Sequence, residues 1–332
     1  KGHLMAREQF HISTQKKNTA KPSGEIILSQ KNGCFLVTGG NFEYAFSEET
    51  GAITQIEWNH NKFLTDLAPA VNFIRAPTDN DGIKILNRNQ NSSLKKWYTW
   101  DLFNLKVKVN KIEISGNHKM AKIVVTKNIF SQSVSKAFQT REVFTINSIG
   151  EIKIDLDIKV NKEINDLPRV GYLFQLKDQY NQLTWFGKGP EESYCDRSYG
   201  CHVDLYRSAV QDQYVNYGMP QEHGNHHDTR WLTIADSKNI GLYVEGATLL
   251  DTSASHFSTK DLHDARHPTD LAKRKEVNLF IDLKQKGLGT GSCGPEALPP
   301  YVLSSNRYQF AFKMVPMKCE PQGAFKKYEE AF

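Results

Sequence analysis

Apolar and polar residues alternate along much of this chain, with a period of two. Ile152–Val160 alternates without a fault, and Leu105–Val109 follows the same pattern. Such alternation is typical of β-strands that bury one face and expose the other. The same reasoning predicts further strands at Cys34–Thr38, Phe42–Phe46, Lys122–Lys127, Tyr172–Leu176, Leu232–Ile234, Gly241–Val244, Val277–Leu283 and Tyr308–Phe312.

Turn-forming pairs separate these segments, and helical periodicity is weak throughout. Asn32-Gly33 and Gly39-Gly40 are two of the turn signals. Ser93–Trp100 indicates one short turn of helix, and Ser258–Arg266 indicates a single helix with Ser258 as its cap. Many short strands with almost no helix predict an antiparallel all-β architecture, and the absence of a fixed repeat argues against a propeller.

One polar segment divides the chain near its start. Thr14–Glu25 carries Lys, Pro, Ser and Gly and has the composition of a linker. The stretch before it, His3–Ile12, has the pattern of one strand, which cannot fold alone. We therefore expect residues 1–13 to be the last strand of a preceding domain, residues 14–28 a linker, and residues 29–332 one large β-domain. Because the sequence does not begin with Met, we expect it to be part of a longer chain.

Composition and charge narrow the class of protein. Hydrophobic residues make up 39% and charged residues 24% of the 332 positions, which is enough for a core and unlike a disordered chain. The net charge of +5 is carried by scattered basic residues, which argues against nucleic-acid binding. No apolar run approaches the roughly 18 residues of a membrane helix. Five cysteines without a CxxC motif argue against a zinc site and a disulfide scaffold, and they leave a cytoplasmic or a periplasmic location open.

The first candidate site is Asn72–Gly82, where two carboxylates, an amide and a glycine follow an Arg-Ala-Pro break. Asp79 and Asp81 have the oxygens that a hard cation prefers, but no Glu follows at the spacing of a calcium loop. We therefore favour a turn held by Asp and Asn side chains, with Gly82 at positive φ.

The second candidate site is Trp185–Arg197, which combines glycines with adjacent carboxylates and an Asp-Arg pair. Glu191 and Glu192 are neighbours, so on an extended chain they point in opposite directions. That arrangement is poor for a catalytic acid and nucleophile, and we interpret the segment as a structural corner.

Two loops complete the set of candidate sites. Tyr214–Trp231 carries three histidines and Asp228, and it is expected to be a loop before the strand at Leu232. Metal binding, sugar binding and a plain surface loop all stay open for it. Lys286–Pro295 is rich in glycine but lacks the Walker lysine and a following helix, so we interpret it as a glycine loop that presents Cys293.

In order and spacing, these segments resemble the carboxy-terminal part of the large β-galactosidases of glycoside hydrolase family 2. The matching stretches are Asn72–Gly82, Trp185–Arg197, Pro220–Leu232 and Gly289–Pro295, within a similarity that runs from about Gly33 to Val315. The resemblance implies a large antiparallel β-supersandwich of the galactose mutarotase type. Lys1–Ile12 resembles the end of the preceding domain, which the resemblance makes immunoglobulin-like.

The resemblance also implies a function for this chain. In that family two glutamates in an earlier TIM barrel hydrolyse terminal β-D-galactosides such as lactose, with retention of configuration. No catalytic residue, metal or cofactor is therefore expected in this chain, which should be inactive alone; Mg²⁺ and Na⁺ are expected for the complete enzyme. Its expected partners are the barrel, the galactoside and further copies of the complete enzyme in a homo-oligomer, with no nucleic acid and no membrane.

The residues expected to wall the substrate pocket are Asp79, Asn80, Asp81, Gly82, His227, Trp231 and Cys293. In the family a mobile loop begins at the glycine that corresponds to Gly82, and glycine supplies the backbone freedom for its closure. Alignment through Pro295 puts Cys293 where the best-known member has a stacking Trp. Because Cys has no stacking face, looser aglycone binding is predicted, unless Trp231 or His227 replaces the contact.

Three further functions stay open. The chain could be a stand-alone small subunit of a heteromeric β-galactosidase, although the strand before the linker argues against it. It could be a non-catalytic galactose-binding module. By analogy of fold it could be a mutarotase, with His223 or His226 as the acid and Glu222 as the base.

Overall fold

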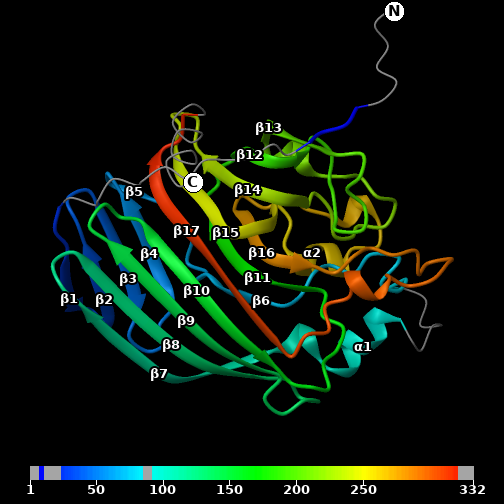
Figure 1. Ribbon diagram of the computed structural model, residues 1–332, viewed down its shortest axis with the longest axis horizontal. Helices are drawn as coiled ribbons and strands as arrows, with labels where there is room; N and C mark the ends of the chain where they lie inside the picture. The colour runs from blue at the N-terminus through cyan, green and yellow to red at the C-terminus, as the bar shows by residue number, and fades with distance from the viewer. Residues whose placement is uncertain (1–6, 11–23, 85–91, 321–332) are drawn as a thin grey trace, which may run out of the picture.

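Strands make up most of the regular structure, as the alternation predicts. The computed structural model describes residues 7–10, 24–84 and 92–320. Within these residues it contains seventeen strands and two short α-helices (Figure 1). All strand pairs are antiparallel, so the predicted antiparallel all-β fold is confirmed.

The strands form two sheets. The smaller sheet follows the sequence order β1 (Ile27–Lys31), β2 (Cys34–Thr38), β3 (Phe42–Ser47), β4 (Ile53–Trp58) and β5 (Asn61–Lys62). The larger sheet contains β6 (Ala70–Asn72), β7 (Lys106–Gly116), β8 (Met120–Phe130), β9 (Phe138–Asn147), β10 (Ile152–Val160), β11 (Arg169–Leu176), β12 (Gln182–Gly189), β13 (His202–Ala209), β14 (His226–Ala235), β15 (Ile240–Ser255), β16 (Val277–Gln285) and β17 (Arg307–Lys318).

The larger sheet branches at its longest strand, β15. Its main path is β13-β12-β14-β15-β17-β10-β9-β8-β7, and a side path runs from β15 through β16 and β11 to β6. The first half of β15, Ile240–Gly246, pairs with β17, whereas Asp251–Ser255 pairs with β16. Three exposed residues, 247–249, separate the two buried halves of the strand. The side path therefore forms a second layer.

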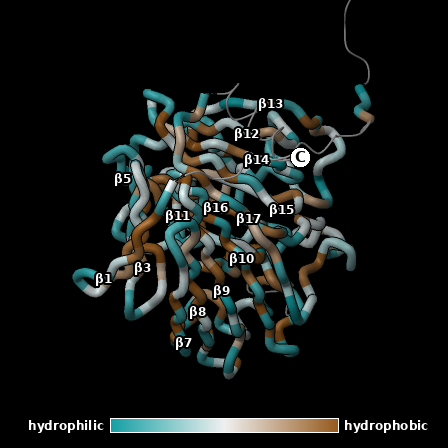
Figure 2. Tube along the Cα trace, turned by 60° about the vertical axis from the view of Figure 1, so that its left-hand side comes forward, coloured by the Kyte–Doolittle hydropathy of each residue, from teal (hydrophilic) through white to brown (hydrophobic). Residues whose placement is uncertain are grey.

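The core lies between these layers. Ile152, Ile154 and Leu156 of β10 are buried, whereas Lys153 between them is exposed, so the predicted alternation is confirmed. Figure 2 shows the corresponding change of brown and teal along β8, β9 and β10. Phe46 of the smaller sheet lies 5.3 Å from Phe144 of β9, between ring centroids. Phe174 of β11 lies 6.2 Å from Phe312 of β17, and Phe312 shares a face of the sheet with Phe144 because both pair with Ile154.

Both predicted helical segments are present. Helix α1 (Ser93–Thr99) is capped by Ser92, and its Trp97 indole donates to the Asp166 carbonyl at 2.7 Å. Helix α2 (Thr259–Asp264) begins with a capping box between Ser258 and Asp261. No helix among the described residues is long and apolar enough to cross a membrane.

The predicted domain boundary is only partly covered by the described residues. Residues 7–10 have no regular structure, and the rest of the predicted strand within residues 1–13 lies outside the described residues. Gln9 both donates to and accepts from the backbone of Val203 in β13. Strand β1 begins at Ile27, two residues before the predicted start of the large domain.

Candidate functional site

The Asn72–Gly82 segment folds as the predicted turn. The Asp81 carboxylate accepts hydrogen bonds from the backbone and the hydroxyl of Thr78, at 2.9 and 3.0 Å. It also accepts two bonds from the Arg75 guanidinium, at 2.7 and 3.2 Å. Asp81 is 1% exposed and Arg75 is fully buried, so this pair lies beneath the surface. Asp81 therefore shapes the turn from below.

Asn80, next to this pair, bonds the glycine loop, which we define as residues 286–298. Its side-chain amide donates to the Gly289 carbonyl at 2.8 Å. Its side-chain oxygen accepts from the backbone and the hydroxyl of Ser292, at 3.2 and 2.8 Å. Gly291 lies so close that a Cβ there would be 2.4 Å from the Asn80 carbonyl oxygen. The first and fourth candidate segments therefore meet, although more than 200 residues separate them.

The second candidate segment holds the glycine loop from its other side. The Asp196 carboxylate accepts from the backbone nitrogens of Leu288 and Gly289, at 2.9 and 2.7 Å. Beyond these anchors the loop turns back at Thr290, and Cys293 is exposed at its tip. The prediction of a glycine loop that presents Cys293 is therefore confirmed.

Glu192 organises the corner of the second segment. Its carboxylate accepts from the Tyr217 hydroxyl, the Arg197 guanidinium and, at 2.8 Å, the backbone of Gly224. Trp185 is 2% exposed, and its ring stacks on His226 with the centroids 4.0 Å apart. These contacts confirm the structural interpretation of this segment.

The third candidate segment becomes a strand earlier than predicted. Strand β14 begins at His226, six residues before the expected start at Leu232. The residues at its beginning are polar because they bond to neighbouring segments. The alternation of apolar and polar residues therefore does not identify this part of the strand. Ser193 accepts from the backbone of His227 at 3.0 Å, and its own backbone donates to the Asn225 carbonyl at 2.7 Å.

His227 stands partly exposed between two carboxylates. Its Nδ1 lies 2.7 Å from Asp251, and its Nε2 lies 3.3 Å from Asp228. Burial opposes its protonation, but these two carboxylates outweigh burial and raise the pKa of His227 above the usual value. Burial instead lowers the pKa of His226 to about 3, so that ring stays neutral. Of these two histidines, His227 is the one that can present charge at the surface.

Trp231 lies in a different environment. It is fully buried in a small cluster with Tyr243 and Val315, against which Phe186 and Met317 pack. A fully buried ring presents no face to a sugar in this arrangement. Trp231 is therefore a packing residue of β14.

Gly82 has a φ of +140°, as the predicted turn requires. Two residues later the half-buried Lys84 ammonium donates to three backbone carbonyls, those of Pro220, Leu262 and Ala265, at 2.7 to 2.9 Å. Burial lowers the pKa of Lys84. The predicted mobile loop continues into residues 85–91, which lie outside the described residues.

The sequence did not reveal the charges that lie beneath these segments. Arg169 of β11 is fully buried, 2.8 Å from Glu222 and 3.0 Å from Asp282 of β16. Burial raises the pKa of Asp282 to about 8; Asp251 and Glu222 add to the rise and Arg169 opposes it. The one signal was an acid inside the apolar run Val277–Leu283. We call the set Arg75, Asp81, Arg169, Glu222, Asp251 and Asp282 the buried ion layer.

These positions define what the site can do. Asp79, Asn80, Gly82, His227 and Cys293 are at least partly exposed, whereas Asp81 and Trp231 are buried. Within residues 7–10, 24–84 and 92–320, no group of three His, Cys, Asp or Glu side chains is placed to hold a metal ion. The exposed groups offer hydrogen bonds and a thiol surface to a polar ligand.

Comparison with known proteins gives a consistent match. A family model described as the β-galactosidase small chain matches residues 38–314. The chain is 29% identical over 325 residues to a β-galactosidase of Priestia megaterium, which covers 95% of this chain and 30% of that protein. It is 30% identical over 256 residues to a β-galactosidase of Kluyveromyces lactis, which covers 74% of this chain and 23% of that protein. The chain thus spans less than a third of the length of these relatives.

Among solved structures, the chain is similar to a galactose 1-epimerase from Lactobacillus acidophilus. The TM-score is 0.48 at 6% sequence identity, and the similarity covers 90% of this chain and 99% of that one.

Proposed function

The chain belongs to the β-galactosidase small-chain family, and from that premise we propose that it walls the active-site pocket of a β-galactosidase. In this proposal it is the carboxy-terminal domain of the enzyme, and a catalytic barrel elsewhere in the protein hydrolyses terminal β-D-galactosides such as lactose. Retaining hydrolysis needs two carboxyl groups about 5–5.5 Å apart, one as acid/base and one as nucleophile. We expect that barrel to supply both, and any Mg²⁺ and Na⁺ sites to belong to the complete enzyme.

The observation that carries the proposal is the fixation of the glycine loop. Asn80 holds it at Gly289 and Ser292 and Asp196 holds it at Leu288 and Gly289, and the exposed Cys293 follows directly after these anchors. A loop that lines a substrate pocket must keep its shape, because small displacements of positioning groups reduce catalysis steeply. The side chains of Asn80 and Asp196 together make five hydrogen bonds to the glycine loop, and these bonds can hold it in one shape.

The proposed wall contains fewer surface residues than the sequence indicated. Asp79, Asn80, Gly82, His227 and Cys293 provide its surface. Asp81 supports the wall from below through Arg75. Trp231, fully buried, provides no contact that could replace the missing aromatic platform.

A mutarotase function would lack a usable acid-base pair. Glu222 is 5% exposed and paired with Arg169 at 2.8 Å. His223 is buried with its Nδ1 at the Gln221 carbonyl, and His226 is buried against Trp185. Groups that are this deeply enclosed have no space for a sugar between them, so we favour the wall function.

An Asn80→Ala substitution in the complete enzyme tests the proposal. It removes three hydrogen bonds to the glycine loop, and we expect KM for lactose to rise about tenfold, equivalent to about 1.4 kcal/mol. The control is Asn128→Ala on β8, where the amide also bonds a neighbouring side chain but lies far along the sheet. Equal KM values for the two variants would contradict the wall.

A separate small subunit and a galactose-binding module each need a test of their own. The mass of the native gene product distinguishes a carboxy-terminal domain from a separate small subunit. Saturable binding of galactose to the 332-residue chain, with no effect of Asn80→Ala on the complete enzyme, would favour a galactose-binding module.

A further inference from the structure

Three rings gather between the two helices, outside the proposed wall. The Tyr98 hydroxyl of α1 lies 2.8 Å from Nε2 of His263 on α2. Phe103 lies 5.5 Å from Tyr98 and 4.8 Å from His263, between ring centroids. We call these three residues the ring cluster. Tyr98 is 46% exposed, so part of its surface is open to a ligand.

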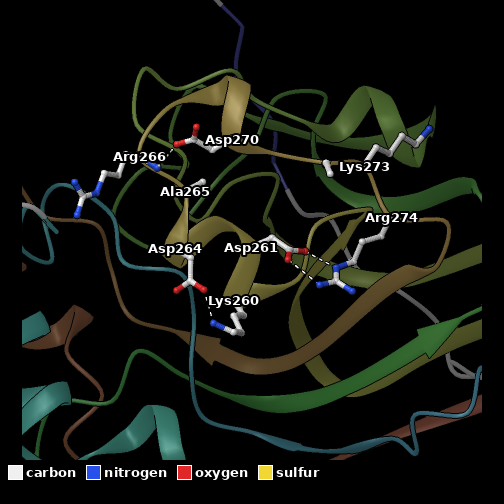
Figure 3. A pocket seen from close by; sticks show the side chains of 9 residues that line it. Lys260, Asp261, Asp264, Ala265, Arg266, Asp270, Lys273 and Arg274 are labelled. Atoms are coloured by element: carbon white, nitrogen blue, oxygen red, sulfur yellow. Dashed lines mark hydrogen bonds and ion pairs between the residues drawn. The ribbon is translucent and has the colours of Figure 1, made fainter.

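A cavity of about 540 Å³ lies at α2 and the segment that follows it (Figure 3), and His263 of the ring cluster bonds Asp264 of its lining at 3.0 Å. It is lined mainly by charged side chains, which include four basic and three acidic residues. These are Lys260, Arg266, Lys273, Arg274, Asp261, Asp264 and Asp270.

The charges of this cavity are largely balanced. Lys260 pairs with Asp264, and Arg274 bonds Asp261 through Nη2 at 2.8 Å, as the dashed lines in Figure 3 show. Asp270 accepts from the backbone of Arg266 at 3.0 Å. A nearly balanced set of donors and acceptors suits a neutral ligand with many hydroxyl groups better than an anion or a cation.

One side chain joins this region to the proposed wall. Lys84 follows Gly82 by two residues, and its ammonium bonds the carbonyls of Leu262 and Ala265 at the end of α2. The same ammonium bonds Pro220, whose neighbour Gln221 accepts from the backbone of Asp79 at 3.1 Å. The end of α2 is therefore held against the segment that carries Asp79 and Gly82.

We propose that the ring cluster and the cavity form an outer subsite for a neutral hexose unit on the aglycone side of an oligosaccharide. The apolar face of the sugar packs on Tyr98, because a Tyr ring offers a large rigid surface at low entropy cost. The Lys260–Asp264 pair at the cavity rim and the other charged groups bond the hydroxyls. The position of this subsite relative to the scissile bond rests on the proposed function, whereas sugar binding itself does not.

Binding and kinetics with galactotriose test the subsite. We expect the 332-residue chain to bind β-1,4-galactotriose saturably, and Tyr98→Ala to weaken this binding by about threefold to tenfold. Tyr98→Phe keeps the ring and should retain most of the affinity. The matched control is Tyr199→Ala, which removes a Tyr that is 93% exposed in the segment before β13. In the complete enzyme, Tyr98→Ala should raise KM for galactotriose and leave KM for nitrophenyl galactoside unchanged.

The outcomes separate the two proposals. Unchanged binding in Tyr98→Ala, or no saturable binding by the chain, overturns the subsite, whatever Asn80→Ala does. Tyr98-dependent binding by the chain, together with no effect of Asn80→Ala on the enzyme, supports a sugar site and overturns the wall. Because Tyr98 and Tyr199 are both exposed, we expect all three variants to fold. If Tyr98→Ala unfolds, Tyr98→Leu, which also removes the ring, takes its place, and unchanged galactotriose binding in that variant overturns the subsite.

Discussion

The buried ion layer and the glycine loop lie next to each other, but they differ in how much a substitution should cost in stability. Arg169 is fully buried and depends on the Glu222 carboxylate at 2.8 Å, and Asp282 is fully buried beside it with a raised pKa. Cys293 is exposed and bonds little more than its own loop. A charge without water costs several kcal/mol unless it is paired, whereas an exposed loop residue can change at little cost.

Because of this difference, one candidate segment can contain both a buried residue that supports the fold and a residue that lies at the surface. Asp81 and Asn80 are neighbours in sequence, yet Asp81 bonds Arg75 in the interior and Asn80 bonds the glycine loop. Mutations in the ion layer should therefore act on stability first, and mutations in the loop should act on ligand binding first.

The largest effect is expected for Arg169→Met. The variant leaves Glu222 buried without its cation and removes the Arg169 contact of Asp282, and removing one partner of a buried pair costs about 3–5 kcal/mol. The control is Arg307→Met, which breaks a bidentate but largely exposed pair with Asp157 and should cost about 1 kcal/mol or less. Urea denaturation measures the free energy of unfolding of both variants. Equal losses would show that the burial of an ion pair does not determine its contribution to stability.

A pH-dependent effect is expected at Asp282. Its pKa rises from the ordinary value of 3.8 to about 8, so the folded chain keeps a proton that the unfolded chain has lost. This contribution to stability is complete below about pH 4 and is lost as the pH rises towards 8. Asp282→Asn cannot ionise and should flatten that decline.

The control for this experiment is Asp157→Asn. Its pKa is lowered, mainly by hydrogen bonds from Arg307, so its contribution is lost only below its ordinary pKa of 3.8. The free energy of unfolding between pH 5 and 9 should therefore keep its slope in Asp157→Asn. An unchanged slope in Asp282→Asn would show that Asp282 is ionised throughout this range.

A smaller loss of stability is expected for Gly82→Val, together with a loss of turnover. At a φ of +140° a Cβ would lie 3.0 Å from Leu94 and Ser92, and such strain costs about 1–3 kcal/mol. The resemblance makes Gly82 the start of a mobile loop, which is the reason to expect the loss of turnover; the contacts add this cost in stability. Gly200→Val is the control, because a Cβ there meets no atom within 4 Å. Equal melting temperatures for both variants would refute the strain.

The smallest effect on stability is expected for Cys293→Trp. Because Cys293 is exposed, the change should stay within about 0.5 kcal/mol. In the complete enzyme the added ring should tighten binding of an aryl galactoside, measured as a lower inhibition constant. Leu298→Trp places the same ring at an exposed position further along the glycine loop, and equal tightening would mean that position 293 has no special access to the pocket.

Much of the fold could be predicted from local pattern. Strands β2 and β10 have the predicted limits, and Ser258 caps α2 as predicted. Alternation fails where both faces of a strand meet protein: β12 was interpreted as part of a corner, and the start of β14 at His226 was missed. In both cases polar side chains face other segments instead of water, so a binary pattern cannot identify the strand.

The candidate site shows the same limit. Local chemistry predicted the turn around Asp81 and the positive φ of Gly82, because both depend on residues a few positions away. It did not predict that Asp196 would hold Leu288, or that Arg169 would lie between Glu222 and Asp282. Those partners come from strands far apart in the chain, and only their pairing brings them together.

The sequence by itself determined the antiparallel strands, the turn residues and the family of this protein, because each depends on short-range pattern or on ordered motifs. The tertiary structure alone decided which polar residues are buried and which are exposed. Asp81 and Trp231 became interior residues, and Asn80 and Cys293 remained at the surface. The physical reason is that burial depends on what the other strands place above a residue, and no property of the residue itself records that.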